Sequence, residues 1–512
     1  MMHPAATAGA TRGAEVFPRV RDWWLLAAAL AVLYLVCLGS RGLNDPDEGR
    51  YANIALAMAK PGGDWWEPRE SGYGHYDKPP LVYWATALSF RAFGFNEWAA
   101  RVPSLLGAAV SLAALAWAAV RLYDARVAWW AVLICGTSLQ FWVLARVLSP
   151  DALMTGWCTL AVAAWAECRH RGGAWTWWTV MLVGWSLAWW TKATPSLVPL
   201  AGLLAGTWAT GDRAGRLALR PGRLLLAILV LGAPWYLSML RRYPELSQFF
   251  FRRELVNRVV GRVDGRHGPL YYYLPLSLAA WLPWWPPAVW KARQARPADW
   301  MRAIGIEGWI VLVGFVVFSL VNSKLPTYTL PLAPWVALGL ARLWCAGMDA
   351  RPSLGRVLPG AIFALVVLGT AAFLPDSVES SLGPNSSLRP VCRYLREQGA
   401  RVVDCDHYWP DVEFYLDDVR VRYVLPANPK QRERPTDPGL HPERFVDPTE
   451  WLTRPTGGER WLVRYRRQRD SPFDALPAAL AGRKAVTIGE FDLYRLDSAE
   501  APGTESTDTA LR

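Results

Sequence analysis

The sequence has few cysteines and none of the short motifs by which soluble proteins hold a nucleotide or a structural zinc ion. Its 512 residues include seven cysteines, and no two of them form a Cys-x-x-Cys pair, which argues against a zinc ribbon or a thioredoxin-like centre. No glycine-rich phosphate loop is present, so nothing in the sequence requires a bound nucleotide. The net charge of +12 comes without a nucleic-acid-binding motif, and we therefore expect no nucleic acid partner.

Two of the cysteines stand apart from the other five. The five lie in or beside apolar stretches, where they look like packing residues, whereas Cys392 and Cys405 lie in a polar C-terminal region. If that region is extracytoplasmic, these two could form a disulfide, and otherwise they remain free thiols. The sequence leaves both alternatives open.

Long apolar runs dominate the chain instead. Hydrophobic residues make up 53% of it, with 31 tryptophans. The apolar blocks are about 17 to 22 residues long, the length at which a helix crosses a hydrocarbon core of about 30 Å. Tryptophan pairs such as Trp23-Trp24 and Trp189-Trp190 lie at block edges, which suits the membrane interface. The sequence predicts a polytopic α-helical membrane protein with about eleven spans, near residues 23–39, 103–120, 127–144, 152–167, 175–190, 195–210, 224–240, 270–290, 305–321, 328–342 and 357–374.

Positive charge is distributed unevenly between the predicted loops. Each loop after an even-numbered span carries two or more arginines or lysines, whereas the short loops on the other side carry only Arg146, Lys192 and Lys324. The positive-inside rule then places the N-terminus in the cytoplasm. Because the number of spans is odd, the C-terminus is expected outside.

This topology divides the chain into four parts. We expect a cytoplasmic N-terminus at residues 1–22, without a cleavable signal peptide. A transmembrane domain at 23–375 follows, with long outer loops at 41–102 and 241–269. The chain then forms a small extracytoplasmic α/β domain at 376–496 and a disordered polar tail at 497–512. Apolar residues at helical spacing in the first outer loop predict two amphipathic helices along the membrane surface, within 51–59 and 81–93. The α/β domain is predicted to have helices near 388–398 and 411–416, and strands at 401–405, 419–424, 460–466 and 484–495.

Five groups of polar residues share the outer face in this topology, and charge near hydrocarbon is usually kept for function. Their carboxylates could move a proton, and their cations could bind a phosphate. Each group also has a plainer explanation, such as a helix N-terminus, a helix cap, a turn or attraction to anionic headgroups. The groups are Asp45-Pro-Asp-Glu-Gly-Arg-Tyr51, His75-Tyr-Asp-Lys-Pro-Pro-Leu81, Arg146-Val-Leu-Ser-Pro-Asp151, the basic loop that contains Arg258 and ends at Pro269, and Ser323-Lys-Leu-Pro-Thr-Tyr328.

Taken together and in this order, the motifs resemble those of the bacterial lipid A aminoarabinose transferases. Those enzymes belong with the protein O-mannosyltransferases in the C superfamily of membrane glycosyltransferases (GT-C). The resemblance covers roughly residues 20–345, and its most specific parts are the opening acidic motif and Ser-Lys-Leu-Pro-Thr-Tyr. The sequence departs from the family in places, for example where Lys192 is followed by Ala193 instead of glycine.

The resemblance implies roles for individual residues. Asp47, Glu48 and Asp151 would be the acidic residues of the active site. The donor and its phosphate would be held by a second set, namely Arg50, Tyr51, Lys78, Arg146, Arg258, Lys324 and Tyr328. Asp77 and His267 match positions that in similar transferases approach each other and hold a structural zinc, although two ligands alone make a poor zinc site.

The implied activity is transfer of a sugar from a polyprenyl phosphate to an extracytoplasmic acceptor, lipid A or a related surface lipid or glycan, at the bacterial inner membrane. The sequence requires no cofactor, and the structural zinc is the one metal that the resemblance suggests. The partners of the reaction are the lipid-linked donor, the acceptor and membrane lipids. An alternative within the class is transfer to Ser or Thr hydroxyls of proteins. A different class is a polytopic transporter or flippase, which would place charges at mid-membrane and break helices within spans.

The loop charges make the topology testable. A periplasm-active reporter fused after residue 380 should be active, and one inserted within 215–222 should be inactive, because basic loops stay in the cytoplasm. Alkaline phosphatase activity in cells measures both. The opposite result at either position would mean that the five polar groups do not share the outer face.

Overall fold

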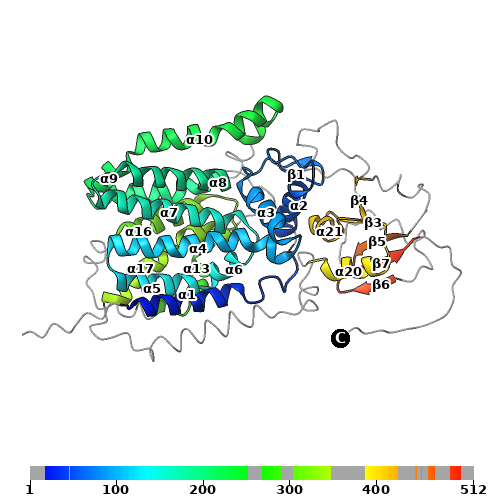
Figure 1. Cartoon of the computed structure of the whole chain (residues 1–512), viewed down its shortest axis with the longest axis horizontal. Coiled ribbons are helices and arrows are strands. Elements are labelled where there is room, and N and C mark those ends of the chain that lie inside the picture. Colours follow the sequence, from blue (N-terminus) through cyan, green and yellow to red (C-terminus); the bar gives the residue numbers. More distant parts are fainter. Residues whose placement is uncertain are drawn as a thin grey trace, which may run out of the picture.

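The chain folds into a bundle of helices with a small sheet domain at one end (Figure 1). The computed structural model describes residues 18–44, 46–251, 268–286, 289, 304–346, 387–424, 444–446, 451, 459–466 and 485–496. The bundle comprises α1 (Val20–Leu35), α4 (Glu97–Leu122), α5 (Ala125–Thr137), α6 (Leu139–Ala145), α7 (Pro150–His170), α8 (Trp175–Ala209), α9 (Arg213–Leu219), α10 (Pro221–Arg242), α13 (Tyr273–Ala280), α16 (Ile306–Leu320) and α17 (Ala333–Ala346). A short α11 (Leu246–Gln248) follows α10, and a 3-10 helix, η2 (Pro326–Leu332), precedes α17.

Small residues let the central helices α4 and α7 approach closely. A Cβ placed on Gly156 of α7 would lie 2.4 Å from the carbonyl oxygen of Gly107 on α4, and one on Gly107 would lie 2.5 Å from the Cα of Leu153. Both distances are far below a normal contact. Glycine is therefore required at both positions for the two backbones to pack as they do.

The element α8 is two helical arms that meet at Lys192, where the backbone leaves the helical region (φ −159°, ψ 87°). Both ends of α8 lie beside the short helix α9. Near the start, Trp178 Nε1 donates to the carbonyl oxygen of Leu219 at 3.3 Å, and near the end, Thr207 accepts from Arg216 Nη1 at 2.7 Å. A straight helix of this length would span about 50 Å, so the chain must reverse direction at Lys192. The predicted break between the spans at 175–190 and 195–210 is confirmed.

The predicted number of eleven spans is not confirmed. Among the described residues, two helical segments are long and apolar enough to cross a membrane, Glu97–Leu122 and Arg213–Arg242. The helices α5 and α6, bent by 64° at their junction, would make a third if they form one span. Some of the other helices are shorter than the predicted spans, such as α1 with 16 residues and α16 with 15. The predicted span at 357–374 lies outside the described residues.

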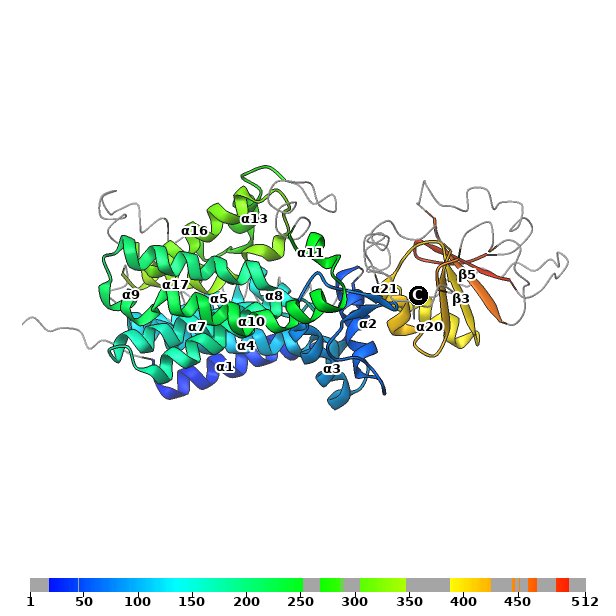
Figure 2. The ribbon, with the colours of Figure 1, turned by 90° about the horizontal axis from the view of Figure 1, so that it is seen from above.

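The first long loop caps one end of the bundle. It forms α2 (Asp47–Ala59), a two-stranded antiparallel hairpin of β1 (Arg69–Glu70) and β2 (Tyr73–Gly74), and α3 (Leu81–Phe93). The two helices occur where the apolar spacing predicts them. However, ten of the thirteen residues of α2 are buried, because α2 lies between α3 and the C-terminal domain (Figures 1 and 2).

The C-terminal domain has a five-stranded mixed sheet in the order β4-β3-β5-β7-β6. Its strands are β3 (Val402–Cys405), β4 (Arg420–Tyr423), β5 (Arg460–Tyr465), β6 (Ala485–Ile488) and β7 (Phe491–Arg495), with helices α20 (Arg389–Glu397) and α21 (Pro410–Tyr415). The segment predicted as one strand at 484–495 is a hairpin of two strands, which turns at Gly489 with φ +58°. Cys392 and Cys405 are both buried in the core of this domain as free thiols.

The contact between α4 and α7 predicts the effect of one added methyl group. Gly156→Ala should lower the free energy of unfolding by about 1–3 kcal/mol, because the new Cβ meets backbone that cannot move aside. Gly222→Ala is the matched control, since a Cβ on Gly222 of α10 meets nothing within 4 Å. Thermal unfolding of the detergent-solubilised protein measures both, and equal melting temperatures for the two variants would contradict the prediction.

Candidate functional site

The predicted site residues that the structure describes lie on segments close to the end of the bundle that carries α2. The acidic motif begins α2, Asp151 begins α7, and Lys192 lies at the reversal of α8. The C-terminal domain lies on the far side of α2 (Figure 2). Arg258 and His267, and also Asp45, lie outside the described residues.

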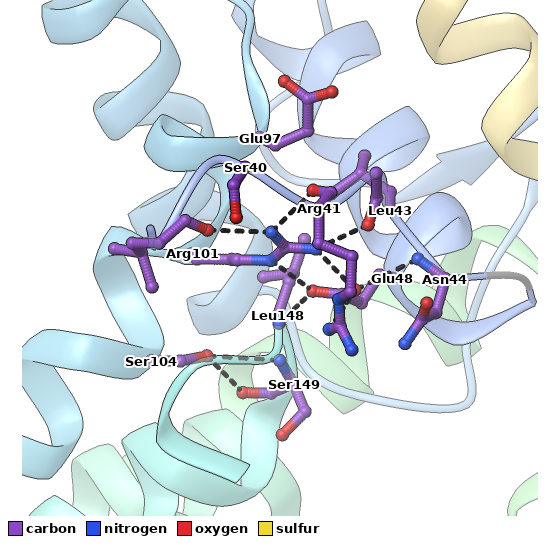
Figure 3. A network of polar contacts seen from close by, with 12 residues as sticks. Ser40, Arg41, Leu43, Asn44, Glu48, Glu97, Arg101, Ser104, Leu148 and Ser149 are labelled. Carbon is purple, nitrogen blue, oxygen red and sulfur yellow. Dashed lines mark hydrogen bonds and ion pairs between the residues drawn. The ribbon is translucent and has the colours of Figure 1, made fainter. Parts of the chain in front are cut away.

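Glu48 is the centre of a buried polar network (Figure 3). Its carboxylate pairs with Arg101, with Nε to Oε1 at 2.9 Å and Nη2 to Oε2 at 3.0 Å. It also accepts the backbone N–H groups of Asn44 and Leu148, at 3.0 and 2.7 Å. Burial by itself would raise the pKa of Glu48, but the charge and hydrogen bonds of Arg101 outweigh burial and leave the pKa below its ordinary value. The carboxylate therefore stays ionised and is occupied by protein groups.

Arg101 completes this network and was not among the predicted site residues. Its remaining N–H groups donate to the carbonyl oxygens of Leu38, Arg41 and Gly42, at 2.7 to 2.9 Å, so all five of its donors are used. The signal in the sequence is an arginine directly before an apolar block. The network holds the chain that leaves α1 against the starts of α2 and α4.

Asp47, the neighbour of Glu48, faces a different direction. About 46% of its side chain is exposed, and Arg50 Nη1 lies 3.4 Å from its Oδ1. Arg50 Nε in turn donates to Glu70 Oε1 at 2.9 Å. Of the two adjacent carboxylates, Asp47 is therefore the one that a substrate can reach.

Lys78 lies near the same face of α2. Its Nζ is 5.1 Å from the centroid of the Tyr51 ring. Tyr51 follows Asp47 by four residues, so the two side chains are neighbours on one face of the helix. The structure thus brings the predicted cation of the second motif toward the predicted carboxylate of the first.

Asp151 forms a second site, with two residues from distant helices. Its Oδ1 accepts a hydrogen bond from Lys192 Nζ at 2.7 Å, and both side chains are buried. The Lys192 Nζ also lies 4.9 Å from the centroid of the Tyr328 ring. The helix-capping explanation for Asp151 is wrong, because Ser149 is the N-cap of α7 and accepts from the Asp151 N–H. Lys192 had no predicted site role, yet it joins Asp151 to Tyr328.

The two carboxylate sites lie on adjoining helix ends. Leu148, whose N–H binds Glu48, precedes Asp151 by three residues. The hydroxyl of Ser104 on α4 donates to the carbonyl oxygen of Ser149 at 3.3 Å and accepts from the Ser149 N–H at 3.2 Å (Figure 3). The start of α7 is therefore tied both to α2 and to α4.

Two predicted phosphate-binding cations contact helix ends in this structure. Arg146 Nη1 donates to the carbonyl oxygens of Leu33 and Tyr34, in the last turn of α1. Lys324 Nζ donates to the carbonyl oxygens of Ser319 and Val321, at the end of α16. A cation is favourable at a helix C-terminus. These contacts give both residues a structural task, so their binding of a phosphate stays a prediction.

Of the predicted zinc pair, Asp77 lies in the described part of the chain and His267 does not. Asp77 Oδ2 lies 4.0 Å from His75 Nε2, and His75 Nδ1 lies 3.1 Å from Glu70 Oε2. Within the described part of the chain, no group of three or more His, Cys, Asp or Glu residues is arranged to hold a metal ion. A structural zinc needs about four ligands. The described residues therefore do not form a zinc site, and no chemical step is assigned to a metal.

The helical bundle contains an apolar cavity of about 210 Å³. It lies between α13, α16 and α17, and its lining includes Leu278, Trp281, Phe315 and Thr329. Thr329 follows Tyr328 in η2, and its hydroxyl accepts from Gln140 Nε2 at 2.6 Å. One residue that lines the cavity is therefore the sequence neighbour of Tyr328.

The sequence alone did not single out Glu70 or Tyr408. Glu70 Oε1 accepts from both Arg50 and Tyr408, and Tyr408 belongs to the C-terminal domain. Glu70 has a weak sequence signal, since it lies five residues before His75 in a loop with several charged residues. Tyr408 has none, because it lies more than 300 residues away from Glu70 and its role depends on how the domains pack.

Comparisons with known proteins agree with the motifs. The family model for dolichyl-phosphate-mannose-protein mannosyltransferases matches residues 77–237. The chain is 32% identical over 349 residues to the undecaprenyl phosphate-alpha-4-amino-4-deoxy-L-arabinose arabinosyl transferase of Pseudomonas aeruginosa (strain UCBPP-PA14), a match that covers 66% of this chain and 61% of the relative. The transferase of the same name from Edwardsiella ictaluri (strain 93-146) is 29% identical over 333 residues, which is 63% of this chain and 59% of the relative. The chain thus spans about three fifths of the length of these relatives.

The fold is also that of a solved structure. The crystal structure of ArnT from Cupriavidus metallidurans bound to undecaprenyl phosphate superposes with a TM-score of 0.71 at 22% sequence identity, and the match covers 95% of this chain and 100% of that chain. This similarity extends over both the helical bundle and the C-terminal sheet domain. The motifs, the family model, the relatives and the fold agree, and the chain belongs to the GT-C superfamily of membrane glycosyltransferases, in the family of the bacterial aminoarabinose transferases.

Proposed function

We propose that the protein transfers a sugar from a polyprenyl-phosphate donor to an acceptor at the extracytoplasmic face of the membrane, most simply lipid A or a related surface lipid or glycan. The observation that carries this proposal is that α2 carries an accessible carboxylate, Asp47, and that a lysine, Lys78, lies over Tyr51, one turn along the same face. The two relatives described above are named for use of an undecaprenyl-phosphate sugar, which supports the donor class.

The chemistry follows from these groups. A nucleophilic atom of the acceptor bonds to the anomeric carbon, the bond from that carbon to the phosphate oxygen breaks, and the phosphate leaves with the electron pair. Lys78 stabilises the charge on the departing phosphate, which is the kind of electrostatic assistance that usually dominates such steps. If the acceptor is a hydroxyl, Asp47 takes its proton. In-line attack inverts the anomeric centre.

The second site fits the same reaction. Lys192 is held between Asp151 and the Tyr328 ring, and Thr329, the next residue after Tyr328, lines the apolar cavity. A prenyl phosphate has a charged head and an apolar tail, and it needs a cation beside an apolar space. We assign the cavity between α13, α16 and α17 to part of the donor tail.

Transfer to protein hydroxyls is the second candidate. The family model that matches residues 77–237 describes protein mannosyltransferases, which favours this alternative to lipid A. The reacting groups would be the same, since Asp47 would take the proton of a Ser or Thr hydroxyl. Mass spectrometry of lipid A, surface glycans and envelope proteins, from cells with and without the gene, distinguishes the acceptors.

The accessible carboxylate gives the first test. Asp47→Asn should abolish transfer and leave the melting temperature unchanged, because the amide keeps the shape of the side chain and removes the charge. The measurement is transfer of radiolabelled sugar from a polyprenyl phosphate by purified protein. An Asp47→Asn protein with full activity would remove Asp47 from the reaction.

Glu48→Gln is the matched comparison at the adjacent position. It should lower the free energy of unfolding by about 3–5 kcal/mol, because it leaves Arg101 buried without its counter-charge. The two neighbouring substitutions should therefore differ in kind, one affecting turnover and the other stability. A Glu48→Gln protein as stable as the wild type would contradict the structural role of the Glu48–Arg101 pair.

The cations give the second test. Lys78→Ala should weaken use of the donor by about ten- to a hundredfold, since a hydrogen bond to a charged group is worth about 1.5–3 kcal/mol. Lys192→Ala should also impair transfer, because it leaves the buried Asp151 without its cationic partner. Lys60→Ala is the control, since Lys60 follows the last residue of α2, is 42% exposed and pairs with Asp417 at 3.0 Å. Initial rates over a range of donor concentrations measure all three, and equal kcat/KM for Lys78→Ala and Lys60→Ala would exclude Lys78 from donor binding.

A further inference from the structure

Glu70 joins three parts of the chain at the boundary between the helical bundle and the C-terminal domain. Its Oε1 accepts hydrogen bonds from Arg50 Nε at 2.9 Å and from Tyr408 Oη at 3.0 Å. Its Oε2 lies 3.1 Å from His75 Nδ1. The side chain is only 5% exposed. The carboxylate thus binds α2, the loop that leads to Lys78, and the C-terminal domain at once.

Arg50 connects Glu70 to Asp47, the proposed catalytic carboxylate. Its Nε binds Glu70, and its Nη1 lies 3.4 Å from Asp47 Oδ1. A guanidinium group is planar and rigid, so holding one nitrogen sets the direction of the others. The position of Glu70 therefore determines where the positive charge beside Asp47 points.

Tyr408 brings the C-terminal domain into this arrangement. Its ring lies 4.8 Å from that of Tyr423 on β4 and 6.1 Å from that of Phe445, so the sheet holds it in place. Its hydroxyl reaches out of the domain to Glu70 and also lies 2.9 Å from Ser71 Oγ. Burial raises the pKa of Tyr408 well above its ordinary value, so the hydroxyl keeps its proton and can donate it to Glu70.

The C-terminal domain contacts α2 at two further places. Asn53 Nδ2 donates to Glu413 Oε2 at 3.0 Å, one turn after Arg50. At the start of α2, a Cβ on Gly49 would lie 2.7 Å from the Cβ of Asp411. The absence of a side chain at Gly49 lets α21 lie directly on the first turn of α2, the turn that carries Asp47.

We propose that Glu70 is a positioning residue, through which the C-terminal domain orients Arg50 and with it the carboxylate of Asp47; this rests on the proposed function of Asp47. The C-terminal domain is then required for turnover, although its sheet contributes no group to the reaction. The hydrogen bond between Tyr408 and Glu70 is the link, and its loss leaves Lys78 in place but changes the direction of Arg50 and Asp47.

The test uses the full-length protein in detergent micelles, with Glu70→Gln, Tyr408→Phe and the double variant. Tyr408→Phe removes one oxygen and should lower kcat by about tenfold, as loss of one hydrogen bond to a charged group does. Glu70→Gln should lower kcat at least as much. Because both act through one chain of contacts, the double variant should be no slower than Glu70→Gln alone. In Tyr408→Phe, which leaves the contact between Glu70 and His75 intact, the KM for the donor and the melting temperature should not change.

Asp417→Asn is the matched control. Asp417 lies in the same interface between α2 and the C-terminal domain and pairs with Lys60 at 3.0 Å, but it does not touch Glu70, Arg50 or Tyr408. It should leave kcat unchanged. A purely structural role for Glu70 would lower the melting temperature with unchanged kcat per folded molecule, and that result would overturn the proposal. The proposal would also be overturned if the effects of the two single substitutions on kcat multiplied in the double variant, because they would then be independent.

A second readout does not depend on sugar transfer. Hydrogen exchange of the amides of residues 47–51 should become faster in Tyr408→Phe and in Glu70→Gln, and should stay at the wild-type rate in Asp417→Asn. If the wild type transfers no sugar from any polyprenyl phosphate, the proposed function fails, and the exchange rates still decide whether the C-terminal domain holds the first turn of α2. Unchanged exchange in Tyr408→Phe would overturn that link.

Discussion

The buried ion pair of Glu48 and Arg101 is the interaction on which the rest of the site depends. Taking two charges out of water costs several kcal/mol for each ion, and the cost is recovered only if every donor and acceptor is satisfied. Here all five donors of Arg101 are used, and Glu48 also accepts two backbone N–H groups. The pair therefore holds the end of α1 and the starts of α2, α4 and α7 in one arrangement.

This arrangement separates the roles of two adjacent carboxylates. Neighbouring residues on a helix point about 100° apart, so when Glu48 turns into the core, Asp47 turns toward the surface. One carboxylate then provides stability and the other remains accessible for chemistry. A rigid core beside an accessible group is what a positioned proton acceptor requires, because small displacements of reacting groups cost much of the rate.

Two other carboxylates in the first loop attach that loop to separate parts of the molecule. Glu67 accepts from Tyr76 Oη at 2.6 Å and from Arg242 Nη1 at 2.6 Å, which ties the loop to the end of α10. Glu70, three residues later, ties it to α2 and to the C-terminal domain. The loop that carries Lys78 is thereby fixed from both sides, and the proposed site depends on parts of the chain that supply none of its reacting groups.

The sequence by itself determined the positions of several helices, the reversal near Lys192, most of the C-terminal strands and the family, because these follow from local patterns of apolar residues, turn residues and short motifs. It also identified Asp47, Lys78 and Asp151 as members of polar groups at helix ends. Only the tertiary structure decided which charges pair. Glu48 meets Arg101 across 53 residues and Asp151 meets Lys192 across 41, and Tyr408 reaches Glu70 across 338. Such pairs depend on which helix faces pack together, and a burial pattern along one segment carries no information about the partner that another segment brings.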